Sequence, residues 1–289
     1  MTPPETIGAR GEQGLTTPLD TRAGARRRRL VTADRALNVL LPLLALATLL
    51  ASWQAAVVGW HISSYVFPRV DTTFASLRDH WPDIWANLLV TLGQAGLGFA
   101  IGNLLAIAGA TLFVYSPLAE RAIFPLAVVI QTIPIIVWSP ILVIALPSDW
   151  WPLGWWPQII IAVLISFFPA LVNMTRGLRA VSPLELELFH VLNASRWQVY
   201  RKLRWPAALP SLFASLRITS TLSLVGAVVG EYVAGGGGGS GYQLQLAKSS
   251  IDTAQVVAIT LVVSVTGIVV FLAVAGLERL ALGQRGHGA

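Results

Sequence analysis

Six long apolar segments dominate this sequence and restrict the folds open to it. A helix that crosses a hydrocarbon core of about 30 Å needs roughly 20 mainly apolar residues. Segments of that kind lie at residues 36–58, 86–114, 120–146, 157–175, 208–230 and 254–276. Backbone groups in lipid must form hydrogen bonds within their own segment, so each segment is predicted to be a helix. The sequence therefore predicts an all-α, polytopic membrane protein with about six transmembrane helices.

The composition agrees with this prediction and argues against an enzyme. Hydrophobic residues make up 55% of the chain and charged residues only 12%, against about 25% charged residues in soluble domains. The sequence has no cysteine and its four histidines, His61, His80, His190 and His287, are far apart, so no metal site is expected. The phosphate-binding pattern G-x-x-x-x-G-K-[ST] is also missing. We therefore expect no catalytic residue and no bound cofactor.

The basic residues predict the orientation in the membrane. If the N-terminus is cytoplasmic, all but three of the 20 Lys and Arg residues fall inside, the exceptions being Arg69, Arg78 and Lys248. This asymmetry is typical of an even number of spans with both termini in the cytoplasm. The net charge of +6 then reflects membrane topology, and no nucleic-acid partner is expected. We expect the protein in the cell membrane of a bacterium.

Eight tryptophans lie near the predicted outer ends of the spans: Trp53, Trp60, Trp81, Trp85, Trp150, Trp151, Trp155 and Trp156. An interfacial belt at the lipid headgroups is the favoured interpretation, and an aromatic ligand site is the alternative. Residues 1–35 are polar and carry the run Arg26 to Arg29. They are predicted to form a disordered cytoplasmic tail near anionic lipid. The transmembrane domain then covers residues 36–280, and 281–289 form a second cytoplasmic tail.

A long segment between the fourth and fifth spans, residues 176–217, carries two helix-start signals. Ser182 and Glu185 form the pattern of a capping box, which predicts a helix over 183–192. Asn193 follows, and Asn tolerates the left-handed conformation that ends helices. Ser195 and Gln198 form the second capping pattern, which predicts a helix to about residue 203.

Prolines are predicted to separate this second helix from the next span, because Pro206 would stop it and Pro210 would open the following helix. The segment between the spans is both apolar and basic, which favours a cytoplasmic docking element for another protein. An amphipathic segment that lies on the membrane without a partner is the alternative.

Residues 182–206 resemble the EAA loop of ABC importer permeases, which reads Glu-Ala-Ala, three residues, Gly, nine residues, Ile, one residue, Leu-Pro. Glu187 takes the Glu position, Asn193 the Gly position and Leu203 the Ile position, and Trp205-Pro206 replaces Leu-Pro. Leu188 and Phe189 depart from the two alanines. Further matches at 131–134, 166–173, 230–231 and 241–242 resemble the nitrate, sulfonate and taurine branch. The resemblance covers about residues 85–280.

The resemblance implies the type I importer permease fold and a set of partners. Two cytoplasmic ATPase subunits would bind the loop and hold the ATP, a second permease copy or paralogue would complete the path, and an external binding protein would deliver the solute. The residues implied in ATPase coupling are Glu187, Asn193, Ala194, Ser195, Arg196, Leu203 and Pro206. Glu187 and Arg196 are the candidates for polar contacts there, and capping the loop is their alternative role. The solutes of this branch include nitrate, sulfonates, taurine, bicarbonate, pyrimidine precursors and flavins.

Polar residues within the apolar segments are candidates for the solute path: Asn87, Gln94, Gln131 and Asn173. Hydrogen bonding between helices is their alternative role. Small residues at Gly98, Gly102, Ala106 and Ala110 predict close helix packing, and the glycines at 235–239 predict a flexible connector. A secondary transporter or a channel subunit without an ATPase partner is the alternative function.

Overall fold

The computed structural model describes residues 40–41, 44–146, 154–235 and 237–283, and its regular elements in these ranges are all helical. The chain divides into two compact units, residues 1–59 and 60–289. In the first unit an apolar helix spans Leu44–Gly59. The whole of the predicted tail at 1–35, part of the first predicted span, Trp150 and Trp151, and residues 284–289 lie outside the described residues.

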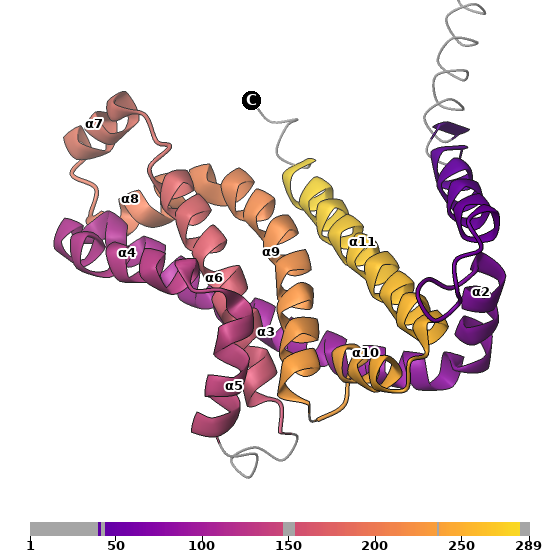
Figure 1. Ribbon diagram of the computed structural model, residues 1–289. Helices are drawn as coiled ribbons and strands as arrows, with labels where there is room; N and C mark the ends of the chain where they lie inside the picture. Colours follow the sequence, from indigo (N-terminus) through magenta and orange to yellow (C-terminus); the bar gives the residue numbers. More distant parts are fainter. Residues whose placement is uncertain (1–39, 42–43, 147–153, 236, 284–289) are drawn as a thin grey trace, which may run out of the picture. The chain divides into compact units, whose positions relative to one another are not determined.

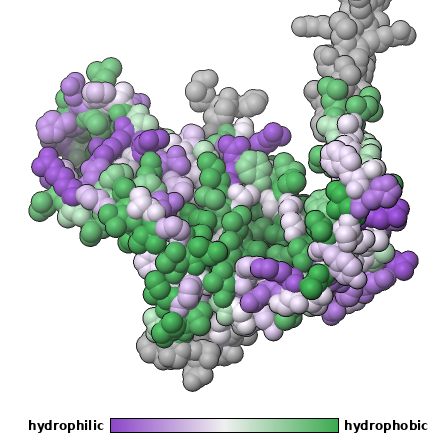
Figure 2. Space-filling view, viewed as in Figure 1, coloured by the Kyte–Doolittle hydropathy of each residue, from purple (hydrophilic) through white to green (hydrophobic). Residues whose placement is uncertain are grey.

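Among the described residues of the second unit, four helices are long and apolar enough to cross a membrane. They are α3 (Trp81–Tyr115), α6 (Trp156–Leu178), the helix over Arg196–Ala234 that ends in α9 (Trp205–Ala234), and α11 (Thr253–Gly283). They correspond to the second, fourth, fifth and sixth predicted spans. Figure 2 shows hydrophobic side chains over much of the face in view, as expected for helices that meet lipid.

The third predicted span is wrong as a single helix, because it consists of α4 (Pro117–Thr132) and α5 (Ile135–Ala145). The two helices meet at an angle of 99°. Pro134 at the break has no N–H to donate, and the residue before a proline is driven out of the helical region. Ile133 accordingly adopts an extended conformation with ψ of 126°. With this pair counted as one broken span, the second unit has up to five spans in its described residues.

Helix α9 also differs from its prediction, because Pro206 does not stop the helix that begins at Arg196. A π-helical turn, η2 (Tyr200–Arg204), follows α8 (Arg196–Val199) and continues directly into α9. The Trp205 N–H reaches back five residues to the Tyr200 carbonyl, so the wider turn accommodates the proline that follows. Pro210 lies inside α9 instead of opening it.

Helix α6 is the centre of the second unit and packs against both α3 and α9 (Figure 1). The predicted small-residue stripe lies at the first of these contacts, since a β-carbon at Gly98 would overlap that of Ala162. Ala106 and Ala110, further along the stripe, are fully buried. The prediction of close packing is therefore confirmed.

Shorter helices flank or connect the long ones: α2 (Val70–Asp79) precedes α3, α7 (Pro183–Val191) follows α6, and α10 (Ser240–Ser249) follows α9. Helix α7 belongs to the segment between α6 and α9, and we call the end of the helices next to it the loop end. Helix α10 connects α9 to α11 at the opposite end. Helix α11 packs against α9, α10 and α2, and an ion pair of 3.0 Å between Arg217 and Glu278 ties it to α9 near the loop end.

Candidate functional site

The segment at 182–206, here called the coupling loop, begins with a fully formed capping box. The Ser182 side chain accepts a hydrogen bond from the Glu185 N–H at 3.3 Å, and the Glu185 carboxylate accepts one from the Ser182 N–H at 3.0 Å. Ser195 and Gln198 repeat this arrangement at the start of α8, with distances of 3.3 and 2.7 Å. Both predicted helix starts are confirmed, and both are stabilised by side chains within the loop itself.

The turn between α7 and α8 is a left-handed helix end at Asn193, which has a φ of 50°. The Ala194 N–H donates to the Phe189 carbonyl at 3.0 Å, and the Asn193 N–H donates to the His190 carbonyl at 2.9 Å. These bonds satisfy carbonyls that the end of α7 would otherwise leave unpaired. The predicted role of Asn193 as a helix terminator is confirmed.

Hydrogen bonds fasten the coupling loop to the long helices. The Tyr115 hydroxyl at the end of α3 donates to the Arg196 carbonyl at 3.1 Å, and the hydroxyls of Thr111 and Tyr200 are 3.0 Å apart. On the other side, Arg204 Nη1 donates to the Leu178 carbonyl, the last residue of α6, at 2.9 Å. These bonds link α8 and η2 to both α3 and α6.

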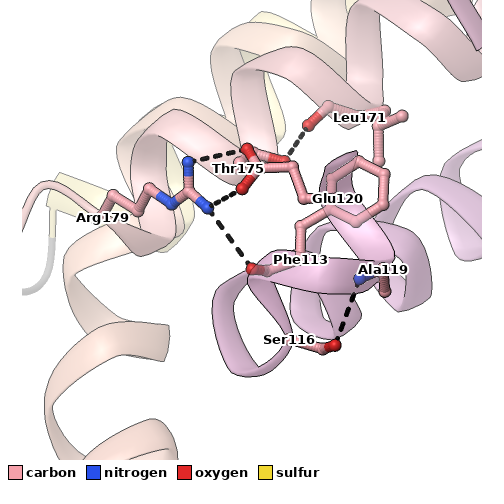
Figure 3. A network of polar contacts seen from close by, with 7 residues as sticks. All are labelled: Phe113, Ser116, Ala119, Glu120, Leu171, Thr175 and Arg179. Carbon is pink, nitrogen blue, oxygen red and sulfur yellow. Dashed lines mark hydrogen bonds and ion pairs between the residues drawn. The ribbon is translucent and has the colours of Figure 1, made fainter. Parts of the chain in front are cut away.

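A second set of contacts joins the neighbouring helix ends (Figure 3). Arg179 donates to both oxygens of Glu120 on α4, at 2.9 and 2.6 Å, and to the Phe113 carbonyl of α3 at 3.3 Å. The hydrogen bond that Arg179 donates to Glu120 raises the pKa of Arg179 above its ordinary value, so the guanidinium keeps its charge at physiological pH. Ser116 caps α4 by accepting from the Ala119 N–H at 3.2 Å. The loop end of α3, α4 and α6 is thus cross-linked by a bidentate ion pair.

The coupling loop exposes an unusual amount of apolar surface, and α7 has no buried residue. Leu184 is 75% exposed and Val191 77%, and Trp197 of α8 is 64% exposed. Glu187, Asn193, Ser195, Arg196 and Pro206 are also exposed, whereas Ala194 and Leu203 are half-buried. A capped, fastened helix with exposed apolar side chains is typical of a protein-docking surface.

The candidate path residues do not gather at one site. Asn87 of α3 accepts a hydrogen bond from the Gly239 N–H at 2.9 Å, and Asn173 donates to the Pro169 carbonyl of its own helix at 2.9 Å. Gln94 is fully buried, and both of its amide atoms are without a hydrogen-bond partner among the described residues. Gln131 is exposed at the break between α4 and α5, where it lines a cavity of about 220 Å³.

A buried carboxylate lies at the end of α9, at Glu231, which the sequence marked only as part of a family match and to which it gave no role. Glu231 is fully buried, and its Oε2 accepts from the Thr91 hydroxyl at 3.0 Å and from the Gly241 N–H at 2.7 Å. The Thr91 oxygen in turn accepts from the Ser240 N–H at 2.8 Å. Together with Asn87 and Gly239, the residues Thr91, Glu231, Ser240 and Gly241 form a cluster. We call it the outer clasp, because it lies at the end of the helices opposite the coupling loop. An acidic residue within an apolar segment was the available signal.

The outer clasp fixes one end of the segment at 235–239, which was predicted to be a flexible connector. Gly239 has a φ of 103°, and a β-carbon there would collide with the Glu231 carboxylate. Its N–H is held by Asn87, so this end of the glycine run has one defined conformation. Gly239 is needed because only glycine adopts such a conformation without strain.

Comparison with known proteins gives a family. Residues 98–282 match the family model of the binding-protein-dependent transport system inner membrane component. The formylaminopyrimidine transport permease protein of Halalkalibacterium halodurans is 34% identical over 70% of this chain and 78% of its own. A putative aliphatic sulfonates transport permease protein of Bacillus subtilis is 26% identical, over 83% and 85% of the two chains. The nitrate import permease protein of a Synechocystis species is 26% identical, over 85% and 90%.

A solved structure of the MetNI methionine ABC transporter, in an inward-facing conformation, has the same fold. Its matching chain superimposes with a TM-score of 0.56 at 18% identity, over 69% of this chain and 94% of that one. The family match covers the second half of α3, all of α6, the coupling loop and α9, and nearly all of α11. The chain therefore belongs to the family of binding-protein-dependent transport system inner membrane components, the permeases of ABC importers.

Proposed function

We propose that this permease forms the solute path of an importer and receives the force of ATP hydrolysis through the coupling loop. The observation that carries the proposal is the loop itself, which is capped at both helices, fastened to α3 and α6, and apolar on its exposed side. A surface of this kind suits a rigid handle for a separate subunit. Two cytoplasmic ATPase subunits would hold this loop and its counterpart on a second permease copy or paralogue.

The permease would carry out no chemistry of its own. Among the described residues no cluster of three or more His, Cys, Asp or Glu side chains could hold a metal ion. ATP would be bound by the partner ATPase, and no cofactor by this chain. An external binding protein would supply the solute at the end that carries α10, and both termini would lie in the cytoplasm with the coupling loop, in the bacterial cell membrane.

The solute would be a small anionic or organic compound. The relatives named for sulfonates and nitrate support an anion, and the relative named for formylaminopyrimidine supports a small organic compound. Broken helices often expose backbone groups to a transported solute, and the break between α4 and α5 places Gln131 and Thr132 at such a point. We propose that Gln131 lines the path, whereas Asn87 serves the outer clasp.

A matched pair of substitutions tests the docking proposal. Leu188 of α7 and Leu246 of α10 are 58% and 51% exposed and lie at opposite ends of the helices. Leu188→Glu places a charge in the proposed docking surface and should release the ATPase during purification of the complex from membranes. Leu246→Glu should retain it. If the protein were a secondary transporter or channel, the unmodified chain would purify without any ATPase. If both variants retained the ATPase equally, the proposed docking surface would be contradicted.

A further inference from the structure

A cavity of about 350 Å³ lies between the coupling loop and the end of α3. Its polar lining consists of Tyr115 from α3, His190 from α7, Arg196 from α8 and Arg204 from η2. Apolar side chains, including Val114 and Leu186, form the rest of the wall. The cavity is therefore a small basic recess with an apolar floor, built from four helical elements.

The positive charge of this recess has no counter-charge among the described residues that line it. None of the described residues that line the cavity is acidic. Glu185, on the same helix as His190, directs its Oε2 to the Ser182 backbone and hydroxyl. Arg204 uses one nitrogen to hold the Leu178 carbonyl, which fixes its guanidinium beside the cavity. Two arginines that line one recess favour an anionic group there, because they otherwise repel each other.

We propose that this recess receives a carboxylate side chain, Asp or Glu, from the cytoplasmic ATPase subunit. The proposal rests on the proposed function, since it requires that an ATPase docks on the coupling loop. The recess adjoins the exposed apolar side chains of α7 and Trp197, so one partner covers both surfaces. Charge complementarity then fixes the orientation of that partner, as it does at other interfaces with an apolar centre and polar contacts around it.

The position of the recess gives this contact a mechanical role. Arg204 belongs to the turn that leads into α9, and Tyr115 belongs to α3. A carboxylate between Arg196 and Arg204 therefore connects the ATPase directly to the start of a span. An ATPase that contacted only the apolar surface of α7 would reach the spans indirectly, through the coupling loop.

A carbodiimide cross-link tests the proposal, because it joins a lysine amine only to a carboxylate in direct contact. The chain has only two lysines, Lys202 and Lys248, so the background is low. The test variant carries Lys202→Arg and Arg196→Lys. The control carries Lys202→Arg and Arg201→Lys. Both variants keep the charge of the loop. The complex purified from native membranes is treated, and the linked peptides are identified by mass spectrometry.

The expected result is an isopeptide bond from the residue 196 amine to an Asp or Glu of an ABC ATPase, absent from the residue 201 control. In parallel, Arg196→Glu should weaken ATPase retention by at least about tenfold relative to Arg201→Glu, because the reversed charge meets the partner carboxylate.

Three outcomes would overturn the proposal. An ATPase that binds the unmodified chain, with no residue 196 link and equal retention by both charge reversals, refutes the recess but leaves the proposed function intact. Retention that depends on Arg196 only in phosphatidylglycerol vesicles would identify a lipid phosphate as the occupant. Absence of any ATPase from the unmodified complex refutes the proposed function and the recess together.

Discussion

The outer clasp predicts that Thr91→Val destabilises the protein although valine has nearly the same size and shape. Thr91 is fully buried, and its hydroxyl both donates to Glu231 at 3.0 Å and accepts from the Ser240 N–H at 2.8 Å. Valine leaves the Ser240 N–H without this partner, while Glu231 keeps the bond from Gly241. The substitution creates no cavity, so its cost comes from the lost hydrogen bonds.

The magnitude follows from those two bonds. A buried group left without its partner costs about 1–3 kcal/mol, and hydrogen bonds within membrane proteins have averaged about 0.6 kcal/mol in mutational cycles. The free energy of unfolding should therefore fall by about 1–3 kcal/mol. Unfolding in mixed detergent, followed by circular dichroism, measures it.

Thr260→Val of α11 is the control, because its exposed hydroxyl bonds the Val256 carbonyl of its own helix. It should change the free energy of unfolding by less than about 0.5 kcal/mol. Equal effects at positions 91 and 260 would refute the reasoning that the outer clasp holds α10 to α3 and α9.

Two further substitutions test packing and turn geometry. Gly98→Ala should lower the free energy of unfolding by about 1–3 kcal/mol, because the new methyl group overlaps Ala162. Gly96→Ala is the control, because nothing lies within 4 Å of the added β-carbon. It should be neutral or stabilising in the same denaturation assay. Asn193→Gly should keep ATPase retention, whereas Asn193→Val should cost about 1–2 kcal/mol at the left-handed position and make the coupling loop more sensitive to limited proteolysis. Equal sensitivity of the two Asn193 variants would contradict the role of the turn.

The long helices and the coupling loop could be predicted because their signals are local. Apolar length predicts a span, and the pairs Ser182–Glu185 and Ser195–Gln198 form capping boxes from neighbouring residues. Asn193 likewise ends a helix through its own backbone preference. Such features depend little on the rest of the fold, so the sequence is sufficient to place them.

The features that the sequence did not predict depend on contacts between distant parts of the chain or on the response of the backbone to proline. Pro206 was expected to stop a helix, but the π-helical turn before it keeps the chain helical. Pro134 instead breaks a span. The role of Glu231 depends on Thr91, which is 140 residues away. The glycines next to this contact were predicted from the sequence to form a flexible connector.

Thiol labelling at position 188 tests the central claim, that the coupling loop is a cytoplasmic docking surface for an ATPase. The chain has no cysteine, so Leu188→Cys and Leu246→Cys each provide a single exposed thiol for a membrane-impermeant maleimide. We predict that the Leu188→Cys thiol reacts only in inside-out vesicles stripped of the ATPase, and that it is protected when the ATPase is restored. The Leu246→Cys thiol should react in intact cells, with or without the ATPase. Labelling at 188 from outside the cell, or equal labelling with and without the ATPase, would contradict the account.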